Sequence, residues 1–275
     1  MLPQTQKTSF VDQWLLARGL PVDLARQMGA VSFNGHPAFA YRRAGEVIYH
    51  KVRRNGDRSD QYTEPAGRGG FAFNDDCLNA RSSPEDVLVI TEGEPDAIAW
   101  SSLGHRFVIS VPFGAPSEVG TDDIDRRNDS NRYSWLWVDG AMDSRIDRFR
   151  KIILAVDGDA QGDCLMQELS IRLGSDRCWY VTYPDDCKDG NDVLAKHGTT
   201  ALGEILRDAR PLVPRTLISF GDLPPEPENQ TYNLGWGEDF HSHCRYTFPS
   251  LMTVTGKPGS GKSLRIPVKA DTVYV

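Results

Sequence analysis

Two short apolar runs, each followed at once by closely spaced acidic residues, constrain this chain more than any other feature. In VLVITEGEPD the run leads into Glu92, Glu94 and Asp96, and in IILAVDGD it leads into Asp157 and Asp159. Runs of this length are typical of strands that are buried on both faces of a sheet. Because helical patterns separate the runs, we expect an α/β fold with a central parallel sheet flanked by helices.

The rest of this region continues the alternation of strands and helices. We expect strands at 87–90, 107–111, 152–156 and 178–184, and helices at 97–104, 135–151 and 164–174. Ligands of such sheets bind beyond the carboxyl ends of the strands, where both acidic groups would lie.

The N-terminal region is predicted to be a small α+β unit. Phe10, Trp14 and Leu15 would share one face of a first short helix, and Pro21 would open a second. AFAYRR and EVIYHKVRR then predict a small antiparallel sheet, with the turn NGD between basic strands and Arg53, Arg54 and Arg58 around its tip.

Charge is unevenly spread along the chain. Residues 42–58 carry a net charge of +4, whereas residues 85–192 hold 22 acids against 11 bases. A basic strip beside an acidic centre suits a polyanion held against metal ions. Two ordinary solvated surfaces would give the same composition, and that alternative stays open.

The five carboxylates point to a divalent metal site. If the two strands are neighbours, the acids converge and share the space by binding cations or by raising a pKa. Oxygen ligands, a glycine within each pair, and no histidine or thiolate nearby favour Mg²⁺ over zinc. The alternative is that short acids after strands cap the following helices, but five at two strand ends exceed what capping needs.

The motifs E-G-E-x-D and D-x-D resemble the TOPRIM domain of primases, topoisomerases and some nucleases, over residues 85–195. YPDDCKDGNDVL resembles the third acidic motif of primases fused to helicases, with Lys188, Asp189 and Asn191 at its K-D-x-N positions. The resemblance implies Mg²⁺ or Mn²⁺ as cofactor. It also implies Glu92, Asp157 and Asp159 as catalytic residues, and Glu92, Glu94, Asp96, Asp157, Asp159 and Asp189 as the metal-binding set.

The basic segment fits the same family. GEVIYHKVRR resembles the strand in which a K-x-R pair of the primase basic subdomain faces nucleotide or template, and Lys51 and Arg53 occupy those positions. The resemblance implies nucleotide or DNA binding by these two residues, Arg54 and Lys188. Phosphate contacts of this kind supply affinity and salt dependence without sequence readout. The alternative is a strand edge that its own charges protect.

A phosphate-binding pattern stands near the C-terminus. LMTVTGKPGSGKS fits G-x-x-x-x-G-K-[ST], with the loop residues Gly256, Gly259, Gly261, Lys262 and Ser263. Resemblance to phage primase-helicases and Twinkle implies that a RecA-like, ATP-binding motor begins here. Only 12 residues follow Ser263, and Pro267 interrupts the expected helix. We therefore expect no ATP hydrolysis by this chain alone, and we interpret it as a truncated product of a longer primase-helicase gene.

Five prolines within residues 211–230 predict a stiff linker. The predicted organisation is a basic primase subdomain at 1–84, a TOPRIM domain at 85–210, the linker at 211–230, and the incomplete start of a RecA-like P-loop domain at 231–275.

Composition excludes several classes of protein. The 275 residues carry a net charge of −7, and 39% of them are hydrophobic, as in a globular protein. The five cysteines form no C-x-x-C pair, so no zinc ribbon is expected, and His241, His243 and Cys244 have no fourth ligand nearby. No apolar run approaches the roughly 18 residues of a membrane span. We expect a protein of the bacterial or phage-infected host cytoplasm, with an organellar matrix as the less favoured location.

These features favour a metal-dependent primase that joins ribonucleoside triphosphates on single-stranded DNA. In an intact primase-helicase the family implies a ring homo-oligomer and replisome partners. A second hypothesis is a catalytically inactive, single-stranded DNA-binding arm of a Twinkle-like helicase, and a third, weaker one is a TOPRIM nuclease. The chain lacks the zinc domain with which many primases read their template, so template-specific initiation is not expected.

Overall fold

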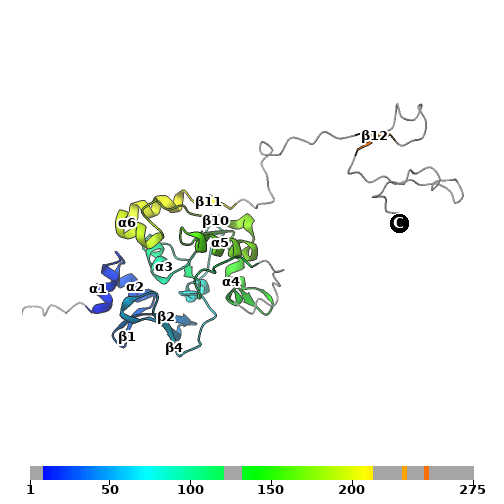
Figure 1. Ribbon diagram of the computed structural model, residues 1–275. Coiled ribbons are helices and arrows are strands. Elements are labelled where there is room, and N and C mark those ends of the chain that lie inside the picture. Colours follow the sequence, from blue (N-terminus) through cyan, green and yellow to red (C-terminus); the bar gives the residue numbers. More distant parts are fainter. Residues whose placement is uncertain (1–8, 121–131, 213–230, 234–244, 248–275) are drawn as a thin grey trace, which may run out of the picture. The chain divides into compact units, whose positions relative to one another are not determined.

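The computed structural model describes residues 9–120, 132–212, 231–233 and 245–247 (Figure 1). The chain divides into two compact units, residues 1–214 and 215–275. In the second unit, β12 (Thr231–Asn233) and β13 (Arg245–Thr247) form an antiparallel pair. The phosphate-binding loop expected at 256–263 and most of the expected linker lie outside the described residues.

The first unit begins with the two expected short helices. Helix α1 (Phe10–Leu16) starts at a capping box between Ser9 and Asp12. Helix α2 (Val22–Met28) follows Pro21 and ends at Gly29, which has a positive φ. Leu15 is buried and Trp14 packs against the core, as predicted, but Phe10 is exposed and Val11 is buried in its place.

A four-stranded antiparallel sheet follows, in the order β1-β2-β3-β4. Its strands are β1 (Ala30–Phe33), β2 (His36–Arg43), β3 (Glu46–Arg53) and β4 (Gln61–Glu64), and the 3₁₀ turn η1 (Arg54–Gly56) precedes β4. Asn34 and Gly35, and again Ala44 and Gly45, have positive φ, which suits two-residue hairpin turns. The predicted basic sheet is thus confirmed, with β1 as an additional strand.

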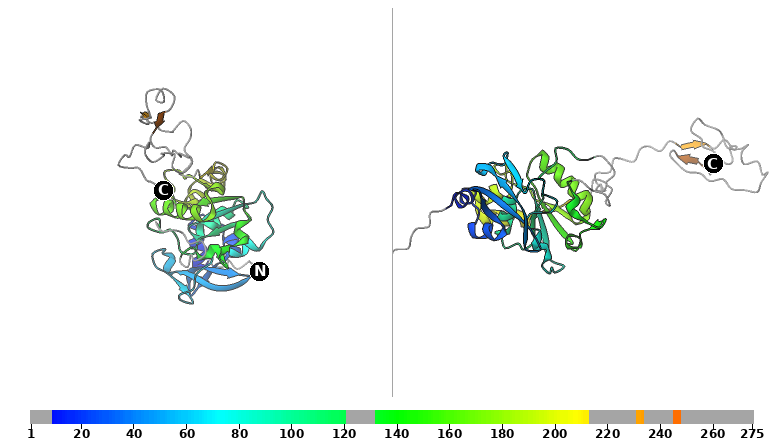
Figure 2. Two further views of the ribbon diagram at one scale, coloured as in Figure 1. Left: turned by 90° about the vertical axis from the view of Figure 1, so that its right-hand side faces the viewer. Right: turned by 90° about the horizontal axis from the view of Figure 1, so that it is seen from below.

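A five-stranded sheet forms the second half of the first unit, in the order β11-β10-β9-β5-β6. Its strands are β5 (Val87–Thr91), β6 (Val108–Ser110), β9 (Lys151–Ala155), β10 (Cys178–Tyr180) and β11 (Arg210–Pro211), and only β11 runs antiparallel to its neighbour. The helices that alternate with them are α3 (Glu94–Ser101), α5 (Ala160–Leu173) and α6 (Gly190–Arg207), and short 3₁₀ turns lie at η2 (Asp75–Asn79) and η4 (Ser175–Arg177). The predicted α/β fold with a central parallel sheet is confirmed, and Figure 2 shows the two sheets and their helices from two further sides.

Both faces of the parallel sheet are buried, as the continuous apolar runs require. Along β5, Val89 belongs to one hydrophobic core with α3 and α6, whereas Leu88 and Ile90 belong to another core with α5. The first core continues into the antiparallel sheet through Phe39 and Tyr41. One apolar core therefore joins the basic sheet to the strands that carry the acidic residues.

The helix expected at 135–151 is not formed. The segment instead holds the 3₁₀ turn η3 (Ser134–Leu136), a small hairpin of β7 (Trp137–Val138) and β8 (Ala141–Met142), and the single-turn helix α4 (Ser144–Asp147). Asp139 and Gly140 both have positive φ, the conformation of a two-residue hairpin turn. The Asp-Gly turn outweighs the apolar spacing that had predicted a helix.

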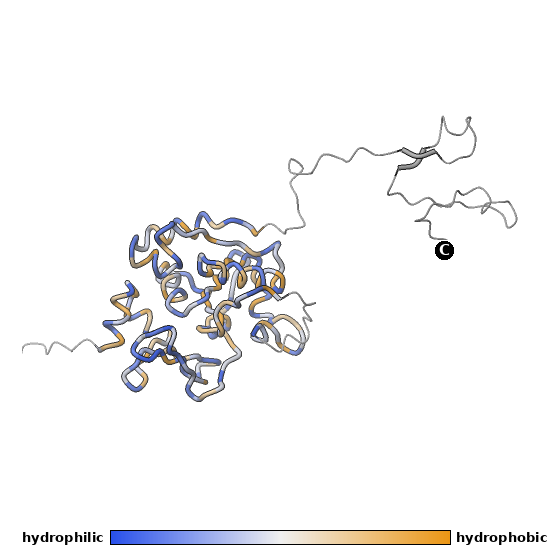
Figure 3. The backbone as a smooth tube through the Cα atoms, viewed as in Figure 1, coloured by the Kyte–Doolittle hydropathy of each residue, from blue (hydrophilic) through white to orange (hydrophobic). Residues whose placement is uncertain are grey.

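Hydrophobic and hydrophilic segments alternate along the described backbone (Figure 3). Within those residues, no helix has both the length and the apolar character needed to cross a membrane.

Candidate active site

The acids of both sequence motifs lie at the carboxyl end of the parallel sheet. Strands β5 and β9 are hydrogen-bonded neighbours, with Thr91 opposite Ala155. Glu92 and Asp157 follow these strands, and both are buried. The Arg58 guanidinium lies between them, as an ion pair with Glu92 and 3.4 Å from Asp157 Oδ2. The predicted approach of the two motifs is therefore present in the structure.

Lys188 joins a second pair of these acids. Its Nζ lies 3.0 Å from Asp157 Oδ2 and 2.9 Å from Asp159 Oδ2. Asp159 also caps α5 by accepting hydrogen bonds from the amides of Gln161 and Gly162. Burial opposes ionisation of Asp159, but the hydrogen bonds from Gly162 and Lys188 outweigh it and lower the pKa of Asp159.

A third contact brings Asp96, Asp157 and Asp189 together. One carboxylate oxygen of each lies within 4.8 Å of the others. Asp96 Oδ1 accepts a hydrogen bond of 3.0 Å from the Asn191 amide, which ties the start of α6 to α3. Burial, with the neighbouring Asp189 and Asp157 carboxylates, raises the pKa of Asp96 well above its usual range. We call Glu92, Asp96, Asp157, Asp159 and Asp189 the acidic cluster.

Two glycines allow the close packing that builds the acidic cluster. A Cβ on Gly162 would meet the Asp157 carbonyl oxygen at 1.9 Å, so only glycine lets the first turn of α5 approach β9. A Cβ on Gly190 would lie 2.5 Å from Trp100 Nε1, so α6 likewise needs glycine to approach α3. Backbone proximity therefore holds the carboxylates close despite their charge.

Capping accounts for only part of the cluster. Asp159 caps α5 and Asp189 caps α6, as the alternative interpretation expected of short acids. Glu92, Asp96 and Asp157 cap no helix of the described residues; the N-cap of α3 is Gly93, and no side chain caps that helix. Burial and the Asp157 carboxylate raise the pKa of Glu92, and Arg58 only partly offsets them.

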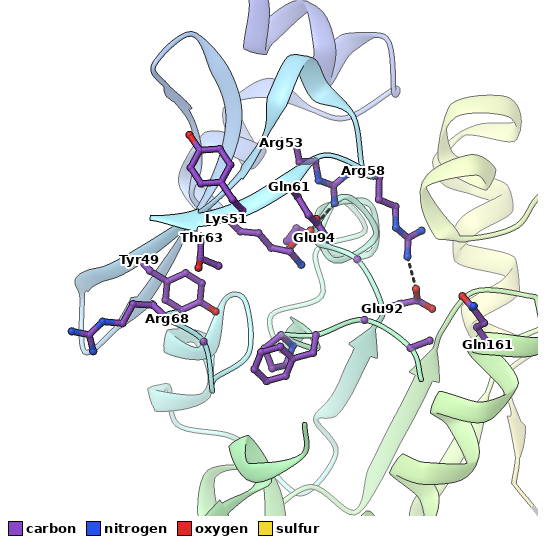
Figure 4. Close-up of a pocket in the computed structure, with 17 residues that line it drawn as sticks. Tyr49, Lys51, Arg53, Arg58, Gln61, Thr63, Arg68, Glu92, Glu94 and Gln161 are labelled. Carbon is purple, nitrogen blue, oxygen red and sulfur yellow. Dashed lines mark hydrogen bonds and ion pairs between the residues drawn. The ribbon is translucent and has the colours of Figure 1, made fainter. Parts of the chain in front are cut away.

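Glu94, although only two residues from Glu92, lies in a different environment. Its Oε1 accepts a hydrogen bond of 2.7 Å from the Tyr41 hydroxyl. Oε1 also lies 2.8 Å from Lys51 Nζ, and Oε2 lies 2.7 Å from Arg53 Nη2 (Figure 4). Burial opposes its ionisation, but Lys51 and Arg53 outweigh burial and lower its pKa. We call Tyr41, Lys51, Arg53 and Glu94 the Glu94 clamp. The expected metal-binding role of Glu94 has no support here, because both oxygens are already paired.

The basic residues predicted to bind nucleic acid also lie in two different environments. Lys51 and Arg53 point to Glu94 and are mostly buried, yet both line a cavity of about 330 Å³. Arg54 is half-exposed and pairs with Asp60 at 2.7 Å, with its guanidinium over the Tyr62 ring.

The cavity is lined by Lys51, Arg53 and Glu94 of the Glu94 clamp and by Glu92 of the acidic cluster. Figure 4 shows Arg58 reaching Glu92 on one side and Tyr49 and Arg68 on the other. Phe113, nearly half exposed, also lines it. Sequence reasoning placed Arg58 at the tip of the basic sheet but gave it no role. Its position within the +4 stretch was the only available signal.

The acidic cluster fits a hard divalent cation. All its donors are carboxylate oxygens, the set that Mg²⁺ and Mn²⁺ prefer. Glu92 Oε2 is buried and has no hydrogen-bond partner among the described residues. An unpaired buried carboxylate oxygen beside further carboxylates is costly unless a cation compensates it.

The fold is that of primase catalytic domains. The chain aligns with a chain of the bacteriophage T7 assembly of lagging-strand DNA polymerase with primase domains bound to an RNA/DNA hybrid and dTTP, with TM-score 0.53 and 22% identity, over 72% of this chain and 91% of that one. It aligns with the primase fragment of the bacteriophage T7 primase-helicase with TM-score 0.51 and 21% identity, over 70% and 73% of the two chains. The DnaG catalytic core gives TM-score 0.51 and 16% identity, over 75% of each chain.

Sequence comparison also finds proteins related to primases. The chain is 29% identical over 239 residues to the chloroplastic/mitochondrial Twinkle homolog protein of Arabidopsis thaliana, covering 82% of this chain. It is 30% identical over 179 residues to the Primase homolog protein of the same plant, covering 63% of this chain. The chain spans 32% and 50% of the length of these two relatives. No protein-family model matches it. In sequence the chain is thus similar to a Twinkle homolog and a primase homolog, and in fold it is similar to primase catalytic domains.

Proposed function

We propose that the first unit is a metal-dependent nucleotidyltransferase that joins ribonucleotides on single-stranded DNA, as primases do. The observation that carries the proposal is the juxtaposition of the acidic cluster with a cavity lined by Lys51, Arg53, Arg58 and Arg68. Acids that favour divalent cations thus border basic groups that favour phosphates. Likeness to primase catalytic domains in fold supports this reading.

The residues divide the chemistry between them. Glu92, with a raised pKa, is placed to accept the proton of an attacking 3′ hydroxyl. Arg58 and Arg68 would bind the phosphates of the incoming nucleotide in the cavity, and Lys51 would add positive charge at its wall. Asp157 and Asp159 with the rest of the acidic cluster would hold Mg²⁺ or Mn²⁺. When bound, the metal supplies charge stabilisation for the transferring phosphoryl group.

A direct test measures primer synthesis. The full chain would be incubated with single-stranded DNA and labelled ribonucleoside triphosphates in Mg²⁺ or Mn²⁺, beside the Glu92→Gln variant. We expect short labelled products from the wild type and a loss on the order of 100-fold or more from the variant. Equal synthesis by a folded Glu92→Gln protein would contradict the assignment.

A second candidate is a non-catalytic DNA-binding arm of a Twinkle-like helicase. It is favoured by the alignment of most of this chain with the Twinkle homolog, and by the ion pairs that Arg58 and Lys188 make with the acids. Salt-dependent binding of single-stranded DNA without metal-dependent synthesis would support it. Motor activity, ring assembly, replisome partners and cellular location remain predictions from the sequence.

A further inference from the structure

A second group of metal-type donors lies beside the acidic cluster and takes no part in it. Asp186 and Cys187 stand in the loop before α6, and His197 stands on α6 itself. One donor atom from each, a carboxylate oxygen, a sulfur and an imidazole nitrogen, lies within 4.8 Å of the other two. These residue types differ in kind from the all-oxygen acidic cluster.

Two of the three donor pairs lie close to the separations found in a tetrahedral transition-metal site. His197 Nε2 lies 3.1 and 3.0 Å from the two Asp186 carboxylate oxygens, and Cys187 Sγ lies 3.5 Å from Asp186 Oδ1. Zinc bonds of about 2.0 Å to oxygen or nitrogen and about 2.3 Å to sulfur, at tetrahedral angles, place such donors about 3.3 to 3.6 Å apart. The three side chains would need only small shifts to share one ion.

We propose that Asp186, Cys187 and His197 form a site for Zn²⁺, with a water molecule as fourth ligand. A thiolate and an imidazole select zinc-type ions over Mg²⁺, which favours oxygen alone. The site is accessible, because the side chains of Asp186 and His197 are 56% and 39% exposed. On binding, the Cys187 thiol releases its proton to solvent and coordinates as the thiolate.

Local backbone structure supports this placement of His197. Gly198 has a φ of 80° and a ψ of −179°, which interrupts α6 directly after His197. The first segment of α6 therefore ends at His197, whose side chain contacts Asp186 in the loop before the helix. Lys196 on the same segment donates to the Asp186 carbonyl oxygen, so loop and helix already contact one another without a metal.

The site would act on the acidic cluster through the chain itself. Cys187 directly precedes Lys188 and Asp189, which pair with or approach Asp157. An ion that joins Cys187 to His197 would hold this loop on α6 and so restrict the positions of Lys188 and Asp189. These two are then positioned by the zinc site, which contains no residue of the acidic cluster.

Metal binding to the full chain tests the proposal independently of primer synthesis. We would measure Zn²⁺ stoichiometry after dialysis, and the absorption spectrum with Co²⁺, for wild type, Cys187→Ser and His197→Asn. Cys164→Ser serves as the matched cysteine control, since Cys164 lies on α5 outside the group, and Asp157→Asn removes an acid of the neighbouring cluster. Circular dichroism would establish that each variant is folded.

We expect one Zn²⁺ per chain and a thiolate-to-cobalt charge-transfer band in wild type, Cys164→Ser and Asp157→Asn. Affinity should fall at least about tenfold in His197→Asn, and the band should vanish in Cys187→Ser. Equal zinc affinity in wild type and folded His197→Asn would overturn the proposal. A cobalt spectrum lacking the thiolate band in wild type would do the same.

Discussion

Glu92 and Glu94 are separated by a single glycine, yet one belongs to the acidic cluster and the other to the Glu94 clamp. Glu94 is surrounded by three donors from the basic sheet, which lower its pKa. Glu92 has Arg58 on one oxygen, its buried second oxygen has no hydrogen-bond partner among the residues that the structure describes, and its pKa is raised. A glutamate therefore holds the two sheets together at position 94, whereas a glutamate at position 92 favours the binding of a cation.

The difference arises from the start of α3. Glu94 is the first residue of the helix; residues 94–100 are all buried, and residues 97–100 belong to the core shared with the basic sheet. Glu92 precedes the helix and lies at the edge of the parallel sheet, next to Asp157. A buried carboxylate that is fully paired helps to hold the folded structure together. Carboxylates that lie close to one another repel and destabilise the fold, so their presence points to a role in binding.

The largest effect on stability is expected for Glu94→Gln. The change leaves Lys51 and Arg53 largely buried without their anionic partner, which costs about 3 to 5 kcal/mol of the free energy of unfolding. Urea denaturation would measure this cost. The matched control is Glu204→Gln, at an exposed position of α6. A loss below about 1 kcal/mol would mean that the clamp does not hold the two sheets together.

Asp157→Asn should have the opposite profile. Primer synthesis should fall on the order of 100-fold, because the acidic cluster loses its shared member, which is close to Asp96, Asp189, Arg58 and Lys188. The free energy of unfolding should be unchanged or higher, since repulsion with Asp96 is relieved. Initial rates and denaturation curves on the same preparation would show whether the two quantities separate. Marked destabilisation would place Asp157 with Glu94 as a structural acid.

The two regions should also respond oppositely to pH. The lowered pKa of Glu94 means that its contribution to stability is present above its ordinary pKa of 4.5 and is lost as pH falls. The raised pKa of Asp96 means that its contribution is present below 3.8 and is lost as pH rises through the folded-state value. Asp96→Asn should therefore gain stability over wild type as pH rises, whereas Glu94→Gln should lose less stability than wild type on acidification.

Urea unfolding between about pH 3 and about pH 8 without divalent ions would measure both slopes. Parallel curves for wild type and Asp96→Asn would contradict the raised pKa of Asp96. Added Mg²⁺ should restore stability to wild type at the upper end of this range, by about 2.7 kcal/mol at 100 times the dissociation constant.

The sequence was sufficient to predict the parallel sheet and the position of its acids. Both follow from local patterns, since short apolar runs form buried strands and the residues after them lie at one edge. It was not sufficient to separate Glu92 from Glu94. That separation depends on the packing of α3 against Tyr41, Lys51 and Arg53, which are more than 40 residues away along the chain.

The helix expected at 135–151 failed for a different reason. Its apolar residues do reach the core, as Trp135, Leu136 and Ile146 are buried. They do so from the 3₁₀ turn η3 and the single-turn helix α4, because a hairpin turning at Asp139 and Gly140 reverses the chain between these two elements. The role of Arg58 was missed because the loop that carries it brings it to acids 34 and 99 residues later.

The smallest effect concerns the basic residues that face outward. Lys51 and Arg53 are directed to Glu94, whereas Arg54 is half-exposed and contacts Asp60 and the Tyr62 ring. We therefore expect Arg54 to be the residue of the three that reaches the phosphates of single-stranded DNA. Arg54→Ala should weaken binding a few-fold and reduce the slope of log affinity against log salt by about 0.7, the value for one phosphate contact on a single strand.

Arg207→Ala, an exposed arginine on α6, is the control and should leave the slope unchanged. Fluorescence anisotropy with a labelled oligonucleotide at several salt concentrations would measure both. An unchanged slope for Arg54→Ala would mean that DNA does not reach the tip of the basic sheet. The charges of that sheet would then serve mainly to hold Glu94 and to line the cavity beside the acidic cluster.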